Sequence, residues 1–231
     1  MREVDEALRQ DEALAVVKNY GKLIGGVLFG GLALFAAWLG WQNYRENQRE
    51  ARAETFVAAL DQLQAGNLDK ASSLLAPLAK EGGDGSQAAA IMLRAGIAAE
   101  QGRQDEAAGL FAQVTGDDSA PQPLRDLAKI RMIALRFDAM KPDDVITALK
   151  PLAVPGNPWF GSAGELLGIA YMQQGRNDLA GPLFASISRD KTVPQSLRQR
   201  AQQMAGLLGV DAVDDVMQAV KQNAGGAPAS Q

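Results

Sequence analysis

The sequence contains no cysteine and no histidine. Without cysteine the chain has no disulfide, no thiol nucleophile and no thiolate metal ligand. Without histidine it also lacks the side chain that proteins use most often as a general base and as a transition-metal ligand. An enzyme built on this chain would have to work with carboxylates, lysine, serine or tyrosine alone. We therefore expect no catalysis, no metal and no cofactor.

Aromatic residues are also scarce, at 6% of the 231 residues, and basic residues are not concentrated in any segment. The net charge is −4, and Lys and Arg stand singly among Asp and Glu, as on a solvated helix surface. Because no basic patch is present, we expect no nucleic-acid partner. Apolar residues reach 47%, with Ala and Leu plentiful, which favours closely packed helices.

Paired acids are the remaining candidates for chemistry, at Asp117-Asp118, Asp143-Asp144 and Asp214-Asp215. Each pair stands beside an expected helix start or turn, so helix capping explains it better than acid-base catalysis or calcium binding. The one glycine-rich loop, Gly82-Gly83-Asp84-Gly85, lacks the Lys-Ser/Thr that follows in a phosphate-binding loop. The sequence therefore predicts no catalytic site.

One hydrophobic run, residues 23–44, contains 22 residues without a charge. As a helix it would span roughly 33 Å, the thickness of the hydrocarbon core of a bilayer. Tyr20 at one end, and Trp38, Trp41 and Tyr44 at the other, suit the two membrane interfaces. A cleaved signal peptide would follow a short basic leader, and a buried helix of a soluble protein is rarely apolar all round. We therefore predict an uncleaved transmembrane anchor.

The charges beside this run do not settle its orientation. Close to the run, three basic residues lie on each side: Arg9, Lys18 and Lys22 before it, and Arg45, Arg49 and Arg52 after it. A cytoplasmic N-terminus with the larger C-terminal part across the membrane is the default. Gly26 and Gly30 have the spacing at which two membrane helices touch closely, although glycine is also simply common in such helices. The first interpretation makes them a membrane-helix contact and allows a homo-oligomer.

A turn motif recurs in the rest of the chain, at Gly66, Gly102 and Gly175, with a weaker copy at Met140. The steps between copies are 36, 38 and 35 residues, and a period near 34 indicates stacked helix-turn-helix repeats. We expect each glycine to end a first helix in the left-handed conformation, and the Asn or Asp beside it to cap the second helix.

Two further positions of each copy predict the core. Five residues after the turn glycine stands a small residue, and four residues later, on the same helix face, stands a large apolar one. These pairs are Ala71 and Leu75, Ala107 and Phe111, Val145 and Leu149, and Ala180 and Phe184.

With these positions the sequence resembles the tetratricopeptide repeat. The last copy has Leu167-Gly168, Tyr171, Gly175, Ala180, Phe184 and Pro194 at the spacing of that repeat, and the second has Ala95, Gly102, Ala107, Phe111 and Pro121. We predict an all-α fold, in which a single N-terminal transmembrane helix precedes a tetratricopeptide-like array of about four helix pairs plus terminal capping helices. A non-repetitive helical bundle is the alternative.

The predicted organisation has four parts: a short cytoplasmic leader (1–22), the transmembrane anchor (23–44), the helical repeat domain (45–222) and a disordered tail (223–231). The helix of the anchor is expected to continue through 45–64 into the first repeat. Two terminal helices, Pro194–Leu208 and Asp211–Gln222, are expected to cover the last repeat, as a stacked array requires.

The resemblance to the tetratricopeptide repeat implies a concave groove lined by the first helix of each pair. The register of that repeat places nine residues there: Phe56, Leu60, Leu63, Met92, Ile130, Phe137, Glu165, Ile169 and Met172. One interpretation is a partly apolar groove for a peptide, and the other places each of these residues in the core. An apolar residue or Glu stands wherever lysine would clamp a C-terminal carboxylate, which argues against that kind of receptor.

A second resemblance rests on residues around the predicted membrane span: Glu12-Ala13, Val17-Lys18, Tyr20-Gly21-Lys22, Gly40-Trp41 and Ala51-Arg52-Ala53. With the repeat array they resemble the bacterial inner-membrane ancillary subunits of the Sec translocon. This implies a periplasmic repeat domain whose partners are Sec translocon subunits and periplasmic chaperones, and which assists the trafficking of secreted and envelope proteins. The alternatives are a periplasm-facing scaffold for cell division or respiratory-complex assembly, an anchored enzyme, and a membrane-tethered oligomer.

Overall fold

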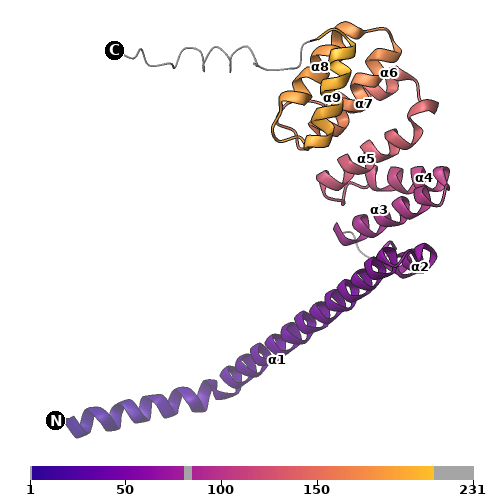
Figure 1. Ribbon diagram of the computed structural model, residues 1–231. Helices are drawn as coiled ribbons and strands as arrows, with labels where there is room; N and C mark the ends of the chain where they lie inside the picture. Colours follow the sequence, from indigo (N-terminus) through magenta and orange to yellow (C-terminus); the bar gives the residue numbers. More distant parts are fainter. Residues whose placement is uncertain (1, 81–84, 211–231) are drawn as a thin grey trace, which may run out of the picture. The chain divides into compact units, whose positions relative to one another are not determined.

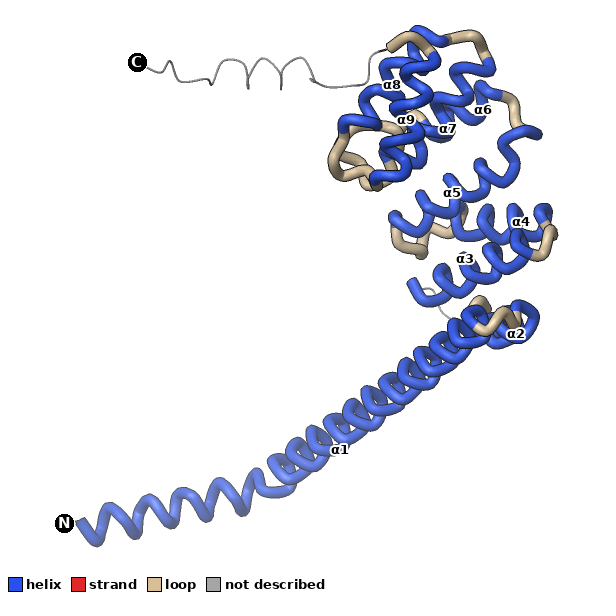
Figure 2. Tube along the Cα trace, viewed as in Figure 1, coloured by secondary structure: helices blue, strands red, loops and turns tan. Residues whose placement is uncertain are grey.

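The computed structural model describes the backbone of residues 2–80 and 85–210, and the side chains of residues 30–32, 34–80 and 85–210. The second predicted terminal helix, 211–222, and the predicted tail, 223–231, lie outside the described residues. Within them the regular structure is helical throughout, with no strand (Figure 2), which confirms the all-α prediction. The chain divides into two compact units, Met1–Val57 and Ala58–Gln231.

Helix α1 (Arg2–Gln64) forms the first unit and begins the second. It runs without a break through the predicted leader, the predicted anchor and residues 45–64. No helix in the part of the chain that the structure describes is long and apolar enough to cross a membrane. The transmembrane helix predicted at 23–44 thus gains no support here, and the side chains of 23–29 and 33 are outside the described residues.

The second unit continues as helix pairs (Figure 1). After the end of α1 come α2 (Leu68–Leu78), α3 (Gly85–Glu100), α4 (Gln104–Thr115), α5 (Gln122–Arg136), α6 (Pro142–Leu149), α7 (Phe160–Gln173), α8 (Asn177–Arg189) and α9 (Gln195–Leu207). Most helices contact the next one along the chain, and α3, α5, α7 and α9 also contact one another in turn. Such contacts between alternate helices are those of stacked helix-turn-helix repeats.

The three turn glycines end their helices as predicted. Gly66, Gly102 and Gly175 have φ angles of 76°, 78° and 71°, which glycine adopts without steric cost. At each, the glycine N–H donates to the carbonyl three residues back (2.9–3.0 Å), and the next N–H donates to the carbonyl five residues back (2.8–2.9 Å). This pair of bonds satisfies carbonyls that a helix end leaves open.

The predicted cap of the second helix is wrong. The N-cap residues of α2, α4 and α8 are Asn67, Arg103 and Arg176, and none of them makes a side-chain capping hydrogen bond. Arginine has no acceptor atom, so it cannot cap a helix N-terminus. The Asn67 side chain instead donates to the Gln62 amide oxygen at 3.1 Å.

The third copy lacks a turn glycine, and its turn differs accordingly. A short 3-10 helix, η1 (Phe137–Ala139), follows α5, and the extended residue Met140 (φ −91°, ψ 150°) leads towards α6. Pro142 is the first residue of α6, where its missing N–H costs nothing. The chain therefore turns without a left-handed residue at this point, which explains the degenerate motif.

The predicted core pairs are all buried. The small residues Ala71, Ala107, Val145 and Ala180 and their large partners Leu75, Phe111, Leu149 and Phe184 are each at most 4% exposed. Two helices cross closely at Gly168 of α7, where an added Cβ would lie 2.5 Å from Cζ of the Phe184 ring. A close crossing of this kind requires glycine because no larger side chain fits between helix backbone and ring.

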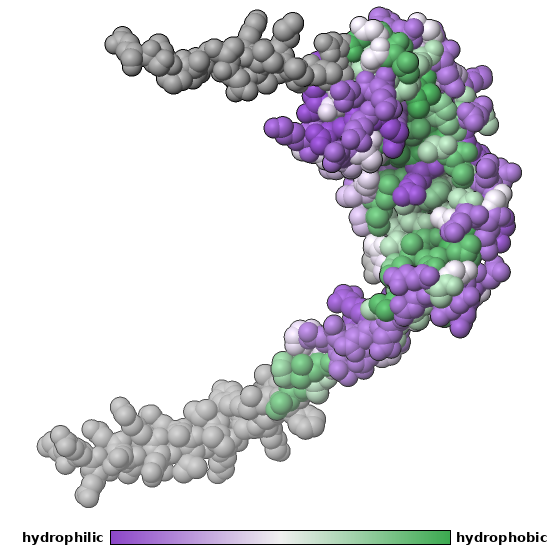
Figure 3. All heavy atoms as spheres, viewed as in Figure 1, coloured by the Kyte–Doolittle hydropathy of each residue, from purple (hydrophilic) through white to green (hydrophobic). Residues whose placement is uncertain are grey.

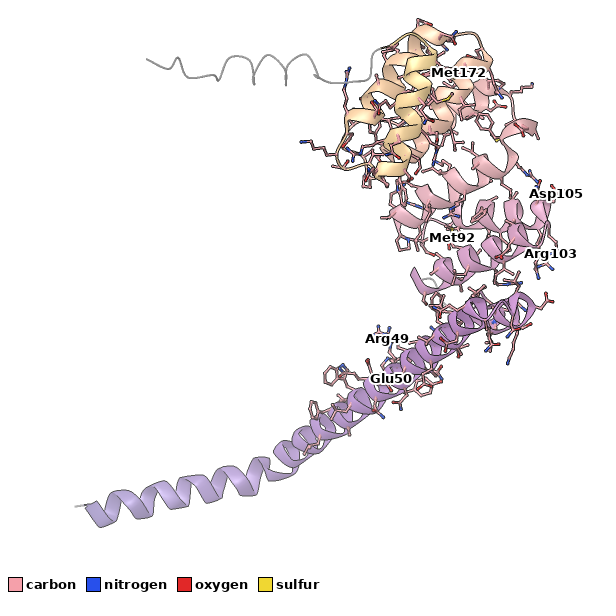
Figure 4. All side chains as sticks on the ribbon, viewed as in Figure 1. Arg49, Glu50, Met92, Arg103, Asp105 and Met172 are labelled. Atoms are coloured by element: carbon pink, nitrogen blue, oxygen red, sulfur yellow. The ribbon has the colours of Figure 1, made fainter. Side chains whose placement is uncertain are left out.

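A polar contact recurs between successive repeats, and we call it the inter-repeat bond. In each case an Asp in the first turn of a second helix accepts a hydrogen bond from the end of the first helix of the next pair. The bonds are Gln101 to Asp69 (2.9 Å), Arg136 to Asp105 (3.0 Å) and Gln174 to Asp143 (2.7 Å). Asp105 lies at the start of α4 (Figure 4).

Helix α9 occupies the position of the first predicted terminal helix and packs on α8 and α7. Its outward residues Gln199, Gln202 and Gln203 are exposed, as the end of a stacked array requires. Leu208 stands where the earlier repeats carry Gln or Arg, before the left-handed Gly209. Asp178, at the Asp position of the last pair, consequently has no inter-repeat bond among the described residues.

Replacing two helical glycines tests the close crossing. Gly168→Ala should destabilise the protein by about 1–3 kcal/mol, because the new methyl group overlaps the Phe184 ring. Gly109→Ala, in α4 with open space around the added Cβ, should stabilise it by about 0.5–1 kcal/mol. Thermal unfolding followed by circular dichroism measures both. Equal effects of the two substitutions would contradict the close crossing.

The inter-repeat bond is tested by a double-mutant cycle on Asp143 and Gln174. We expect Asp143→Ala and Gln174→Ala to be coupled by about 0.3–1 kcal/mol, as exposed polar pairs are. Asp178→Ala is the matched control, since it removes a first-turn Asp that has no such bond. Its effect should be smaller than that of Asp143→Ala in denaturant unfolding, and additive single-variant effects at Asp143 and Gln174 would rule the bond out as a stabilising contact.

Candidate protein-interaction groove

A pocket of about 450 Å³ opens among the first helices of three successive repeats. Helix α3 supplies most of its lining, with Met92, Leu93, Gly96, Ile97 and Glu100. The rest comes from Leu63 at the end of α1, Phe111 of α4, and Leu127 and Arg131 of α5. We call it the α3 pocket. On the face that Figure 3 shows, apolar surface lies over the repeat domain between polar margins.

The α3 pocket brings together two of the residues predicted to line a groove, Leu63 and Met92. Both are partly buried, as is Leu60 one turn before Leu63. Phe56 is also partly buried but belongs to the first unit of the chain. Two of the nine predicted residues thus line one pocket around α3, and the wider groove stays a prediction.

The other predicted groove residues have different positions. Ile130 is 6% exposed and belongs to the core of the C-terminal repeats. Phe137, Ile169 and Met172 are partly buried and pack against that same core. Figure 4 shows Met172 on α7 and Met92 on α3, so the two methionines belong to different repeats. For these four residues the structure corresponds to the core interpretation.

Glu165 has a structural partner. Both of its carboxylate oxygens accept hydrogen bonds from Arg200 of α9, at 2.8 and 2.9 Å. The hydrogen bond and the negative charge of Glu165 raise the pKa of the Arg200 guanidinium above its ordinary value. A bidentate pair of this kind fixes geometry as well as charge, so Glu165 ties the terminal helix to the last repeat.

Sequence reasoning missed Gly96, which lines the α3 pocket, although a signal was present. Leu60, Gly96 and Ile169 each stand six residues before a turn glycine, so they occupy one position of the repeat. Leu60 and Ile169 were predicted to line the groove, and Gly96 was not. At this position the missing side chain leaves space, since nothing lies within 4 Å of a Cβ added to Gly96.

Glu100 and Arg131 were also missed, and they are the charged residues of the α3 pocket. Both side chains are exposed, and neither makes a hydrogen bond or ion pair with any residue in the described ranges. Met92, Gly96 and Glu100 are spaced four residues apart, which places them on one face of α3. The four-residue spacing from Met92 therefore indicated, from the sequence alone, that Glu100 lies on the same face of α3.

The paired acids have ordinary structural roles. Asp117 accepts hydrogen bonds from the Ser119 hydroxyl (2.6 Å) and the Ser119 N–H (2.9 Å), which lower the pKa of its carboxyl group. Asp118 pairs with Arg125 at 2.8 Å. The capping prediction is thus wrong for Asp117, because the N-cap of α5 is Pro121.

Asp190 forms the same kind of turn as Asp117, with the residue two positions later as the donor. It accepts bonds from the hydroxyl and the N–H of Thr192 at 2.6 and 2.8 Å, and these bonds lower the pKa of its carboxyl group. The capping prediction is also wrong for Asp143 and Asp144, because the N-cap of α6 is Lys141 and no side chain caps that helix. Both acids lie in the first turn of α6, where they suit the helix dipole, and Asp214-Asp215 lies outside the described residues. No group of three or more acidic side chains in the described ranges is placed to hold a metal ion.

The predicted membrane-helix contact stays a prediction. Gly30 is exposed in α1, with nothing within 4 Å of an added Cβ. Gly26 lies in the part of α1 that is described by its backbone alone.

Comparison with known proteins gives one match. No curated protein and no solved structure is detectably similar to the chain. The model of the tetratricopeptide repeat-like domain matches residues 16–188, which is most of the chain. This range includes both the α3 pocket and the buried pairs of all four repeats. The repeated left-handed glycines, the buried small and large pairs and this match lead to one conclusion: the chain belongs to the tetratricopeptide repeat-like domain family.

Proposed function

We propose that this chain is a protein-interaction module that its N-terminal helix anchors in the bacterial inner membrane, with the repeat domain in the periplasm. Tetratricopeptide-like domains mediate protein–protein interactions, so the module itself follows from the family. The membrane, the compartment and the partners are the parts that we propose.

The observation that carries the anchor is a band of exposed apolar side chains on α1. Leu32, Leu34 and Trp41 are 66%, 75% and 65% exposed, and Phe35, Trp38, Leu39 and Tyr44 are also exposed. Figure 3 shows a green, hydrophobic patch on the described part of α1. A water-soluble protein rarely exposes so large a contiguous apolar surface, whereas lipid would cover it. The uncharged run 23–44 and its aromatic residues support the same proposal.

The partners are proposed from the resemblance around the membrane span. It favours association with Sec translocon subunits and periplasmic chaperones, in support of the trafficking of secreted and envelope proteins. Anchoring would hold the repeat domain near the exit of the translocation channel. Tethering raises the local concentration of a binding site, so that weak contacts become effective.

A crosslinking experiment on native membranes tests the partners. We expect the protein to stay in the membrane fraction after a carbonate wash, and its crosslinks to identify translocon subunits or periplasmic chaperones by mass spectrometry. Crosslinks to cell-division or respiratory-assembly proteins would support the alternative scaffold instead. Release of the protein by carbonate would contradict the anchor.

The compartment is tested by cysteine labelling, which is simple because the natural chain contains no cysteine. A Gln199→Cys variant carries its thiol on the exposed side of α9, and a Glu6→Cys variant carries it near the N-terminus. In intact cells a membrane-impermeant maleimide should label Gln199→Cys, and it should label Glu6→Cys only after lysis. The reverse pattern would overturn the proposed orientation.

A further inference from the structure

We propose that the α3 pocket binds one large apolar side chain of a partner protein, between a basic group of the partner beside Glu100 and an acidic group beside Arg131. This inference rests on the proposed function only in taking the domain as a protein-interaction module. It does not depend on the membrane, the compartment or the translocon.

The space in the pocket comes from Gly96. Gly96 lies inside α3 and its φ angle is not positive. The helix backbone therefore does not require a glycine at this position. Nothing lies within 4 Å of a Cβ added there, while Gly161, Gly164 and Gly168 of α7 are each filled by a neighbouring side chain. The missing side chain at Gly96 therefore leaves open space in the pocket, and no neighbouring side chain fills it.

The lining of the pocket selects an apolar group. Ile97 and Phe111 are 2% and 4% exposed, and Leu63, Met92, Leu93 and Leu127 are partly buried around them. A volume of about 450 Å³ falls in the range of sites that bind ligands, and it accommodates a leucine, methionine or phenylalanine side chain. Burial of such a side chain there removes apolar surface from water on both partners.

The charges of Glu100 and Arg131 favour particular residues on either side of the partner's apolar side chain. Glu100 is on α3 and Arg131 is on α5, both line the pocket, and neither is paired within the described part of the chain. Water solvates both exposed charges in the free protein, so an uncharged small molecule or a lipid tail could fill the pocket but would gain no attraction from them. A peptide that carries Lys or Arg on one side of its apolar residue and Asp or Glu on the other pairs with both. Charge complementarity therefore favours a protein partner.

A peptide-binding experiment tests this specificity. The full-length protein in lipid nanodiscs is titrated into fluorescein-labelled peptides of eleven residues, acetylated and amidated, with a central Leu between Lys and Glu in either order. One charge order should bind, and replacing its Leu with Ser should weaken binding by about tenfold, because the buried apolar contact is lost. Equal binding of the Leu and Ser peptides would overturn the proposal.

Variants of the protein assign the binding to this pocket. Gly96→Leu places a side chain in the pocket at a position where an added Cβ has open space, and it should reduce binding to the level of the Ser peptide. Gly109→Leu, on the exposed side of α4, should leave binding unchanged. The double variant Glu100→Lys with Arg131→Glu should prefer the reversed charge order. Circular dichroism of each variant confirms folding. Binding to folded Gly96→Leu as tight as to the natural protein, or an unchanged charge preference of the double variant, would overturn the proposal.

The peptide-binding test of the α3 pocket can fail or succeed independently of the crosslinking test of the proposed function. If the peptides fail while membrane crosslinking still recovers envelope proteins, the interaction function uses a different surface and the pocket proposal falls alone. If the crosslinks fail while the peptide specificity and its variants hold, the proposed partners fall and the pocket remains.

Discussion

The close crossing of helices is the constraint on which the repeat domain depends. A pair of helices of this length cannot bury its own apolar face, so each pair completes its core against the next one. The crossing is close only where one helix presents a small residue, as at Ala71, Ala107 and Ala180, which are fully buried. At Gly168 the Phe184 ring approaches the backbone so closely that even a methyl group would overlap it. The core of the array is therefore built at positions chosen for smallness as much as for hydrophobicity.

Two local devices hold the stacked pairs in register. The left-handed glycine ends the first helix with a fixed pair of backbone bonds, and this sets where the second helix begins. The inter-repeat bond then joins the end of each first helix to the first turn of the preceding second helix. Leu208 replaces the donor at the last described position, and α9, the last described helix, has a polar outer side. A few polar atoms at the helix ends thus help to set the register of the described repeats.

The candidate site arises from a change at one repeat position. Ile169 fills that position in the last repeat and packs on the core, whereas Gly96 leaves it empty in the second. The same residue type at Gly168 has the opposite consequence, because a ring occupies the space. A glycine inside a helix can therefore mark either a close crossing or a pocket, and only its neighbours decide which. Glu100 and Arg131, which are unpaired among the described residues, place one negative and one positive charge at the pocket that contains Gly96.

Local patterns along the chain predicted the helical class, the repeat period, the turn glycines and the buried pairs. These follow from local physics, since periodicity, left-handed backbone and side-chain size are read along the chain. The sequence also determined the uncharged run at 23–44 and the absence of cysteine and histidine. The packing of the helices revealed that Leu63 and Met92 share a pocket while Ile130 is in the core, and that Glu165 pairs with Arg200. Those outcomes depend on which helices meet and on what occupies the space between them, and residues far apart in the chain settle both.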